Sequence, residues 1–209
     1  MKSIRIFLML FVSASISLSA ASIDDLTYTV NGDTITITDC NISASGELVI
    51  PDTIDGLPVT VIGEKAFSEC IDQIVERSKK FQFDKLAAIE SRGFVFASAV
   101  SYILKKPFIL LRKKNKLPGD VHSIDFELEY GTATMEVHKD AISKNDSVLL
   151  IDDLIATGGT AEAAAKLIEM SQGKVAGYVF VINLFDLGGC DNLIKKGYKV
   201  ENLIEFPGH

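Results

Sequence analysis

The chain has 209 residues, of which 47% are hydrophobic and 23% are charged, so it can bury the core of one domain with a small addition. Its net charge of −7 argues against a general nucleic-acid binder, which would normally present a basic surface. The three cysteines, Cys40, Cys70 and Cys190, are widely spaced and odd in number, which indicates neither a disulfide framework nor a zinc site.

The first residues have the order of a secretory signal peptide. Lys2 and Arg5 precede an apolar run, and small residues from Ser13 onward follow it, with cleavage expected near Ala20. The apolar run is short and is followed by serines, so a membrane-spanning helix is not expected and the mature chain has no predicted membrane partner. We therefore predict a signal peptide-like segment at 1–21; a buried N-terminal helix is the alternative.

Residues 22–65 have the pattern of short β-strands. Polar and apolar residues alternate through 28–37 on both sides of Asn31-Gly32, which predicts a β-hairpin. Two further short β runs follow at 48–51 and 59–62, separated by turn-forming residues.

The stretch 26–70 resembles a single unit of the BspA-type leucine-rich repeats that occur on secreted and surface proteins. A repeat unit of this kind cannot bury its apolar face alone and usually requires about three or more neighbours. This chain supplies one unit. Together with the signal-like segment, the repeat predicts a secreted interaction protein as one alternative function.

From residue 66 to 209, β-like and helical runs alternate. Apolar residues at helical spacing in 68–81 predict a helix. Short apolar runs predict strands at 86–89, 108–111, 148–151 and 175–184, and helical runs lie at 94–104 and 159–171. Strands without in/out alternation that are separated by helices are typical of a parallel sheet covered on both faces. We therefore predict an α/β fold.

The stretch 148–160 predicts a phosphate site. An apolar strand runs into Asp152 and Asp153, which places both carboxylates near the edge of a parallel sheet where ligands bind. A glycine-containing turn and a helix follow, so backbone amides at the positive end of the helix can face an anion. The residues of this predicted phosphate-binding turn are Ala156, Thr157, Gly158, Gly159 and Thr160. The spacing fits neither a P-loop nor a G-x-G-x-x-G loop.

The sequence from Asp152 to Thr160, Asp-Asp-Leu-Ile-Ala-Thr-Gly-Gly-Thr, resembles the motif with which type I phosphoribosyltransferases bind 5-phosphoribosyl-1-pyrophosphate (PRPP), in the form found in the adenine enzymes. The resemblance covers about residues 66–209. It implies the type I phosphoribosyltransferase fold and the transfer of the phosphoribosyl group from PRPP to adenine, which gives AMP and pyrophosphate in purine salvage. It also implies Mg²⁺ as cofactor and a homodimer, with Asp152 and Asp153 as catalytic residues.

Glu90-Ser91-Arg92-Gly93-Phe94 follows a predicted strand and begins a helix, where an arginine can hold a phosphate group through two hydrogen bonds. A surface charge is the alternative for this arginine. The segment resembles the family's pyrophosphate loop, which assigns Ser91 and Arg92 to pyrophosphate and implies a cis peptide bond between Glu90 and Ser91.

Residues 112–116, Arg-Lys-Lys-Asn-Lys, place four cations in five positions. A solvated loop explains this composition equally well. The family resemblance assigns Lys113 and Lys116 to pyrophosphate, where cations would stabilise the developing charge of the leaving group.

Residues 127–131, Glu-Leu-Glu-Tyr-Gly, resemble the family's mobile catalytic loop. The resemblance makes Glu129 the acid/base candidate near the purine, and it makes Tyr130 a pyrophosphate-binding residue that helps to close the site against water. Leu154 and Leu184 would supply apolar contacts to the base.

The family's N-terminal segment, which contains Pro-Gly and Phe-Arg-Asp and forms a hood over adenine, is not found in residues 1–65. The signal-like and repeat-like segments stand in its place. A catalytically impaired PRPP-binding module is therefore a second alternative function. The family implies a cytoplasmic enzyme, whereas the N-terminal segment implies a secreted or periplasmic one.

Overall fold

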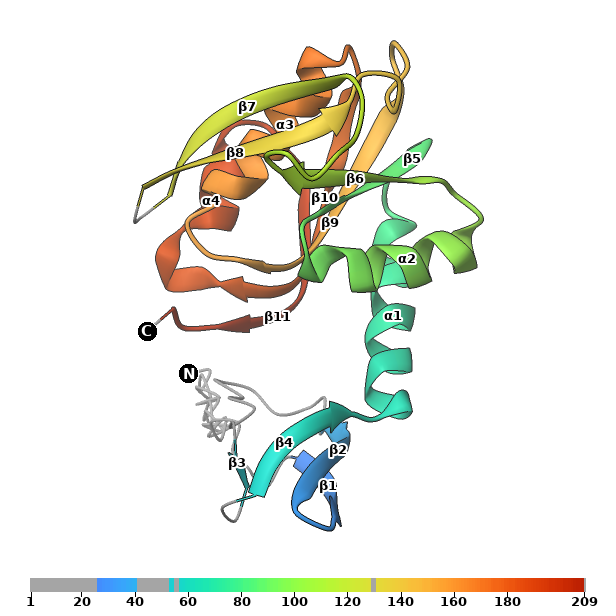
Figure 1. Cartoon of the computed structure of the whole chain (residues 1–209), viewed down its shortest axis with the longest axis vertical. Helices are drawn as coiled ribbons and strands as arrows, with labels where there is room; N and C mark the ends of the chain where they lie inside the picture. The colour runs from blue at the N-terminus through green and yellow to red at the C-terminus, as the bar shows by residue number, and fades with distance from the viewer. Residues whose placement is uncertain (1–25, 41–52, 55–56, 129–130, 209) are drawn as a thin grey trace, which may run out of the picture.

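The computed structural model describes residues 26–40, 53–54, 57–128 and 131–208 (Figure 1). The predicted signal peptide at 1–21 and the predicted β run at 48–51 lie outside the described residues, as do Glu129 and Tyr130. No helix in the described part of the chain is long and apolar enough to cross a membrane.

A seven-stranded sheet organises most of the described chain. In spatial order its strands are β11 (Val200–Phe206), β10 (Lys174–Leu184), β9 (Ser147–Ile155), β5 (Lys85–Ile89), β6 (Phe108–Lys113), β8 (Gly131–His138) and β7 (Val121–Leu128). The strands from β11 to β6 run parallel, whereas β8 is antiparallel to both β6 and β7. The predicted parallel sheet is therefore confirmed, and an antiparallel hairpin extends it at one edge.

Helices cover both faces of this sheet, as predicted. They are α1 (Glu64–Ser78) and α2 (Arg92–Leu104) on one face, and α3 (Gly159–Met170) and α4 (Gly189–Lys195) on the other. In β9, Leu149 and Ile151 pack toward α1 and α2, while Leu150 packs with the core beneath α3. All three are at most 1% exposed, and burying a side chain of this size contributes about 1.5–3 kcal/mol. This explains why the strand sequence is apolar without alternation.

The hairpin formed by β7 and β8 was not predicted, because its sequence is polar and amphipathic. Ile124 and Phe126 in β7 are partly buried against the core that includes α3, while Ser123 and Asp125, which alternate with them along the strand, are exposed. Such alternation is usual for antiparallel strands with one solvated face. This alternation is difficult to recognise in the sequence because it lies within the long polar segment that follows β6.

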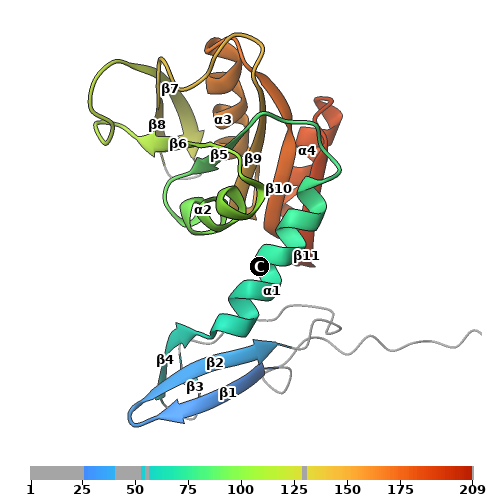
Figure 2. The same ribbon diagram turned by 90° about the vertical axis from the view of Figure 1, so that its right-hand side faces the viewer.

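A separate four-stranded sheet precedes α1. Its strands are β1 (Leu26–Asn31), β2 (Thr34–Cys40), β4 (Leu57–Ile62) and β3 (Thr53–Ile54), in that spatial order. The predicted hairpin is confirmed, with its two-residue loop at Gly32-Asp33, one position later than the Asn31-Gly32 signal. This sheet lies beyond the amino-terminal end of α1, apart from the seven-stranded sheet (Figures 1 and 2). The helix α1 continues across the predicted boundary between residues 65 and 66.

Candidate active site

A pocket of about 340 Å³ lies where the carboxyl ends of the parallel strands β5, β6 and β9 meet. This is the edge at which open α/β sheets bind ligands. The pocket is also lined by the starts of α2 and α3. Its lining residues are Ile89, Glu90, Ser91, Arg92, Lys113, Asp152, Asp153, Leu154, Ile155, Ala156, Thr157, Gly158, Gly159, Thr160, Ala161 and Phe180.

The two acidic residues lie where β9 extends beyond its neighbour β5. The last pair between these strands is Ala88 with Ile151, whereas β10 continues to pair with β9 as far as Ile155. From Asp152 onward, one side of β9 therefore faces the start of α2. Gly93 allows this close approach, because a Cβ atom at that position would lie 2.8 Å from Oδ1 of Asp152.

The carboxyl group of Asp152 has a perturbed pKa. Burial raises this pKa to about 8, and the charge of Asp153 adds to the increase, while the Asp153 N–H and the charge of Arg92 oppose it. The Asp153 N–H donates to Oδ1 of Asp152 at 2.9 Å. Without a ligand, the raised pKa favours the protonated form of Asp152, which can donate a hydrogen bond as well as accept one. Perturbed groups of this kind are concentrated at functional sites.

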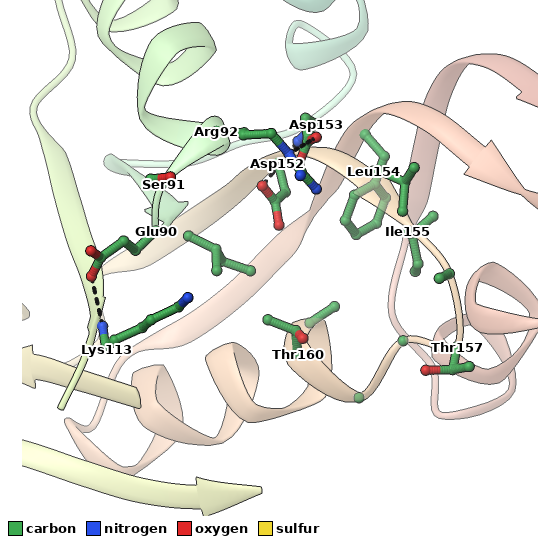
Figure 3. A pocket seen from close by; sticks show the side chains of 16 residues that line it. Glu90, Ser91, Arg92, Lys113, Asp152, Asp153, Leu154, Ile155, Thr157 and Thr160 are labelled. Carbon is green, nitrogen blue, oxygen red and sulfur yellow. Dashed lines mark hydrogen bonds and ion pairs between the residues drawn. The ribbon is translucent and has the colours of Figure 1, made fainter. Parts of the chain in front are cut away.

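Arg92 reaches from the start of α2 to the acidic pair. Its Nε atom donates to Oδ2 of Asp153, and the two form an ion pair (Figure 3). The Arg92 side chain is 75% exposed, so solvent screens the attraction and the pair contributes little to stability. The guanidinium carries further N–H groups that can reach an anion in the pocket.

The predicted phosphate-binding turn rests on the start of α4. Gly158 has φ +90°, a conformation that favours glycine. The Gly189 N–H donates to the carbonyl oxygen of Ala156 at 3.0 Å. A Cβ atom at position 189 would collide with that same oxygen and would lie 2.9 Å from the Gly158 nitrogen. Only a glycine at 189 therefore permits this contact between the turn and α4.

The start of α3 supplies backbone donors to the pocket. Gly158 is the N-cap, without a side-chain cap, and the Glu162 N–H donates to the Gly158 carbonyl at 2.9 Å. The amides of Gly159, Thr160 and Ala161 precede this bond, so they have no acceptor within the helix. All three residues line the pocket. Free amides at the positive end of a helix form an anion-binding site.

Lys113, at the end of β6, lines the opposite side of the pocket. Its side chain points from β6 toward α3 in Figure 3. Its backbone N–H donates to Oε2 of Glu90 at 2.8 Å. Burial alone raises the pKa of Glu90, but the Lys113 N–H and the hydrogen bond and charge of Arg112 outweigh it, so the pKa lies below its usual range.

The structure brings most of the predicted site residues together. Those that line the pocket are Ser91, Arg92, Lys113, Asp152, Asp153, Leu154 and the five residues from Ala156 to Thr160. Lys116 and Leu184 are not among the residues that line it, and Glu129 and Tyr130 lie outside the described residues. The peptide bond between Glu90 and Ser91 is cis, as the sequence analysis predicted.

Two features of the site were missed from the sequence. The motif around Ser91 predicts no role for Glu90, although the Glu90 carboxylate accepts the backbone N–H of Lys113. The predicted site also does not include Gly189, although this residue holds the phosphate-binding turn. The adjacent Gly188-Gly189 pair, directly before a helix, was the available signal for a close backbone approach.

Comparison with known proteins identifies the family of this chain. The family profile of the phosphoribosyl transferase domain matches residues 61–203. An adenine phosphoribosyltransferase of Pelagibacter ubique is 78% identical over 144 residues, which cover 69% of this chain and 82% of the relative.

Solved structures of the same enzyme share the fold. The adenine phosphoribosyltransferase of Thermoanaerobacter pseudethanolicus is 42% identical, with a TM-score of 0.65, covering 68% of this chain and 81% of that one. The enzyme of Saccharomyces cerevisiae, complexed with D-2,5-dideoxy-2,5-imino-altritol 1,6-bisphosphate and adenine, is 34% identical, with a TM-score of 0.62 and coverage of 68% and 81%. The chain therefore belongs to the phosphoribosyltransferase family, and within it to the adenine phosphoribosyltransferases.

Proposed function

We propose that this protein transfers the 5-phosphoribosyl group of PRPP to adenine, giving AMP and pyrophosphate, as a purine-salvage enzyme. The observation that carries the proposal is the composition of one pocket. A backbone phosphate cradle, an acidic pair and two cations face the same space, which matches the phosphate, hydroxyl and pyrophosphate groups of PRPP.

The 5′-phosphate of PRPP would occupy the turn from Ala156 to Thr160. The free amides at the start of α3 would donate to its oxygens, and the hydroxyls of Thr157 and Thr160 would add two donors. The backbone of the turn is fixed by Gly189 before any ligand arrives. Binding therefore requires little reorganisation, which favours affinity.

The ribose hydroxyls would lie against Asp152 and Asp153. The raised pKa of the first carboxyl favours its protonated form, and the second carboxyl is paired with Arg92, so the pair can both donate and accept hydrogen bonds. Contacts to both hydroxyls would fix the orientation of C1 relative to the incoming base. Most of the catalytic effect would come from such positioning.

The pyrophosphate group would be held by Ser91, Arg92 and Lys113, with Lys116 and Tyr130 as further contacts proposed from the family resemblance. As the bond from C1 to the pyrophosphate oxygen breaks, negative charge grows on the leaving group, and these cations would stabilise it. Arg92 would exchange its bond to Asp153 for bonds to the pyrophosphate. Its exposed side chain leaves room for this movement.

Mg²⁺ fits this site. It binds oxygen ligands, keeps several waters and is usually held by one or two carboxylates together with substrate phosphates. Asp152 and Asp153 provide carboxylate oxygens next to the proposed pyrophosphate position. When bound, the ion would neutralise charge on the pyrophosphate and make it a better leaving group.

Adenine would attack C1 through a ring nitrogen and pass the proton of that nitrogen to Glu129, the acid/base candidate. Leu154 lines the pocket and would contact one face of the base, with Leu184 proposed for a further apolar contact. Water must be kept from the oxocarbenium-like C1, and closure of the loop that carries Glu129 and Tyr130 would exclude it.

A second candidate function is a PRPP-binding module with impaired catalysis. The observation in its favour is that no described residue from β1 to β4 lines the pocket, although that part of the chain stands where the family has its hood. The two candidates differ in how they would respond to the two substrates. Both require PRPP to bind, but only the enzyme requires adenine to react.

The exposed face of α2 is a suitable contact for the proposed homodimer. Val95, Tyr102 and Ile103 are 55%, 74% and 45% exposed. Val95 and Tyr102 are seven residues apart, so they share one face of the helix. An apolar helix face of this kind favours contact with a second copy.

Because the reaction uses PRPP, a cytosolic metabolite, we expect the enzyme to act in the cytoplasm. Use of the signal-like segment would place the enzyme elsewhere.

The test uses the full chain with Mg²⁺ and compares binding with turnover. PRPP alone should raise the unfolding temperature, and adenine added with PRPP should yield AMP. A rise in unfolding temperature without AMP would support the PRPP-binding module. The absence of both responses would reject the two candidates together.

A further inference from the structure

The turn after β6 carries the lysine that lines the pocket. The Lys116 N–H donates to the Lys113 carbonyl at 3.2 Å and closes the turn, and Asn115 within it has φ +62°. Among the four cations of Arg112–Lys116, Lys113 is the one that lines the pocket. The position of its ammonium group therefore depends on what holds this turn in place.

Glu136 fixes the turn from Lys113 to Lys116 by a hydrogen bond to its backbone. It lies in β8 opposite Arg112, and it is 5% exposed. Its Oε2 atom accepts the Asn115 N–H at 2.9 Å, and the Ser123 hydroxyl lies 3.5 Å from its Oε1. A buried carboxylate is costly unless its hydrogen bonds are made. The hydrogen bond to Asn115 connects the turn from Lys113 to Lys116 to the β7–β8 hairpin.

Glu90 holds the turn from the side of the pocket. Its Oε2 atom accepts the Lys113 N–H at 2.8 Å, and both of its oxygens lie 3.3 Å from guanidinium nitrogens of Arg112. The same guanidinium donates to the Lys116 carbonyl at 3.0 Å. The guanidinium of Arg112 therefore fixes the turn through these hydrogen bonds, while the side chain of Lys113 lines the pocket.

The charges of these carboxylates would by themselves oppose a polyanionic ligand. Glu90 lines the pocket, so its negative charge lies near the position proposed for pyrophosphate. A purely attractive site would not contain it. Its hydrogen bonds to the Lys113 backbone and to Arg112 give it a different role, which is to determine where the cation is placed.

We propose that Glu90 and Glu136 are positioning residues for the pyrophosphate half of PRPP, acting through the backbone of the turn from Lys113 to Lys116. Neither carboxylate touches the ligand. Each holds one backbone N–H of the turn, and together they keep the Lys113 ammonium in the pocket. The inference rests on the proposed function, because that function places pyrophosphate beside Lys113.

Pyrophosphate binding to the full chain tests this directly, measured by calorimetry with Mg²⁺ and without adenine. Glu136→Ala removes the acceptor for Asn115 and should weaken pyrophosphate binding about ten-fold or more. Glu136→Gln keeps an oxygen acceptor at the same place and should restore affinity to within about three-fold of the parent. Glu90→Ala removes the acceptor for the Lys113 N–H together with the partner of Arg112 and should weaken binding about ten-fold, and it provides a second variant if Glu136→Ala does not fold.

Asp84→Ala is the matched control, because Asp84 also accepts a backbone N–H, from Ser147 at 2.8 Å, but at the amino end of β9. It should leave pyrophosphate affinity unchanged. In turnover assays, Glu136→Ala and Glu90→Ala should raise KM for PRPP while KM for adenine stays constant.

Equal losses in Asp84→Ala and Glu136→Ala, or unchanged affinity in Glu90→Ala, would overturn the inference. So would a parent chain that does not bind pyrophosphate. A parent that binds pyrophosphate but forms no AMP would instead contradict the proposed function, and the comparison of variants would still test the inference.

Discussion

Gly189 donates its backbone N–H to the carbonyl oxygen of Ala156 at 3.0 Å, so the start of α4 supports the phosphate-binding turn from behind. The contact joins residues that are 33 positions apart in the sequence. It places a rigid helix beneath a turn that must present its amides to a ligand. A binding constellation is most effective when the elements that support it are themselves fixed.

Gly189→Ala should therefore impair PRPP binding. The added Cβ atom would collide with the Ala156 oxygen and push the turn away from α4. We expect KM for PRPP to rise about ten- to a hundred-fold, which is the effect of displacing a binding group by about 1 Å. Steady-state AMP formation at varied PRPP measures it.

The neighbouring Gly188→Ala is the control. Gly188 has φ +72°, so alanine adds backbone strain there, but no heavy atom lies within 4 Å of its Cβ position. Equal KM values for PRPP in the two alanine variants would show that α4 does not position the turn.

The raised pKa of Asp152 predicts a pH-dependent stability. Its folded pKa of about 8 lies above the ordinary value of 3.8 for an aspartate, so the folded protein binds a proton that the unfolded chain releases. Stability from this group is complete below pH 4 and decreases as pH rises toward 8, by at most about 1.4 kcal/mol per pH unit.

Asp152→Asn should remove this dependence. Its unfolding free energy, measured in urea from pH 5 to 8 without ligand, should exceed that of the parent by an amount that grows with pH. A difference that stays constant or shrinks as pH rises would contradict the raised pKa.

Arg92 should contribute to binding much more than to stability. Because its side chain is largely exposed, Arg92→Ala should lower the unfolding free energy by no more than about 1 kcal/mol. Loss of a charged contact to pyrophosphate should raise KM for PRPP about ten-fold or more. Arg77→Ala is the matched control, since Arg77 lies on α1, pairs with Glu201 of β11 and does not line the pocket. Similar KM values for PRPP in both variants would show that Arg92 does not contact the pyrophosphate group.

Lys113 and Lys114 form a second matched pair. Both are exposed and adjacent, but only Lys113 lines the pocket. Lys113→Ala should raise KM for PRPP about ten-fold, while Lys114→Ala should change it less than about two-fold. The effect of Lys113→Ala should also become smaller as salt concentration increases. Equal effects of the two substitutions would indicate a general electrostatic attraction.

The sequence was informative where chemistry is local. The Asp152-Asp153 pair, the glycine turn and the following helix are consecutive, so their common edge follows from the parallel-strand pattern. The contact of Glu90 with Lys113 joins β5 to β6, which requires knowing that these strands are neighbours. That information is tertiary and no local pattern contains it.

Lys116 illustrates the same limit within a single motif. Composition and family resemblance placed it with Lys113, but the turn bonds its N–H to Lys113 and its carbonyl to Arg112, and its side chain does not line the pocket. The direction of a turn depends on its hydrogen bonds, and in particular on the left-handed residue Asn115. None of these is visible as a charge pattern.

We propose that this chain makes AMP from adenine and PRPP at the pocket that Asp152 and Asp153 line. The most direct measurement follows AMP and pyrophosphate formation by the full chain with Mg²⁺, beside a variant that carries Asp152→Asn and Asp153→Asn. We expect equal amounts of the two products from the parent chain and loss of both in the variant. Failure of the parent to form AMP, or AMP formation that persists in the variant, would contradict it.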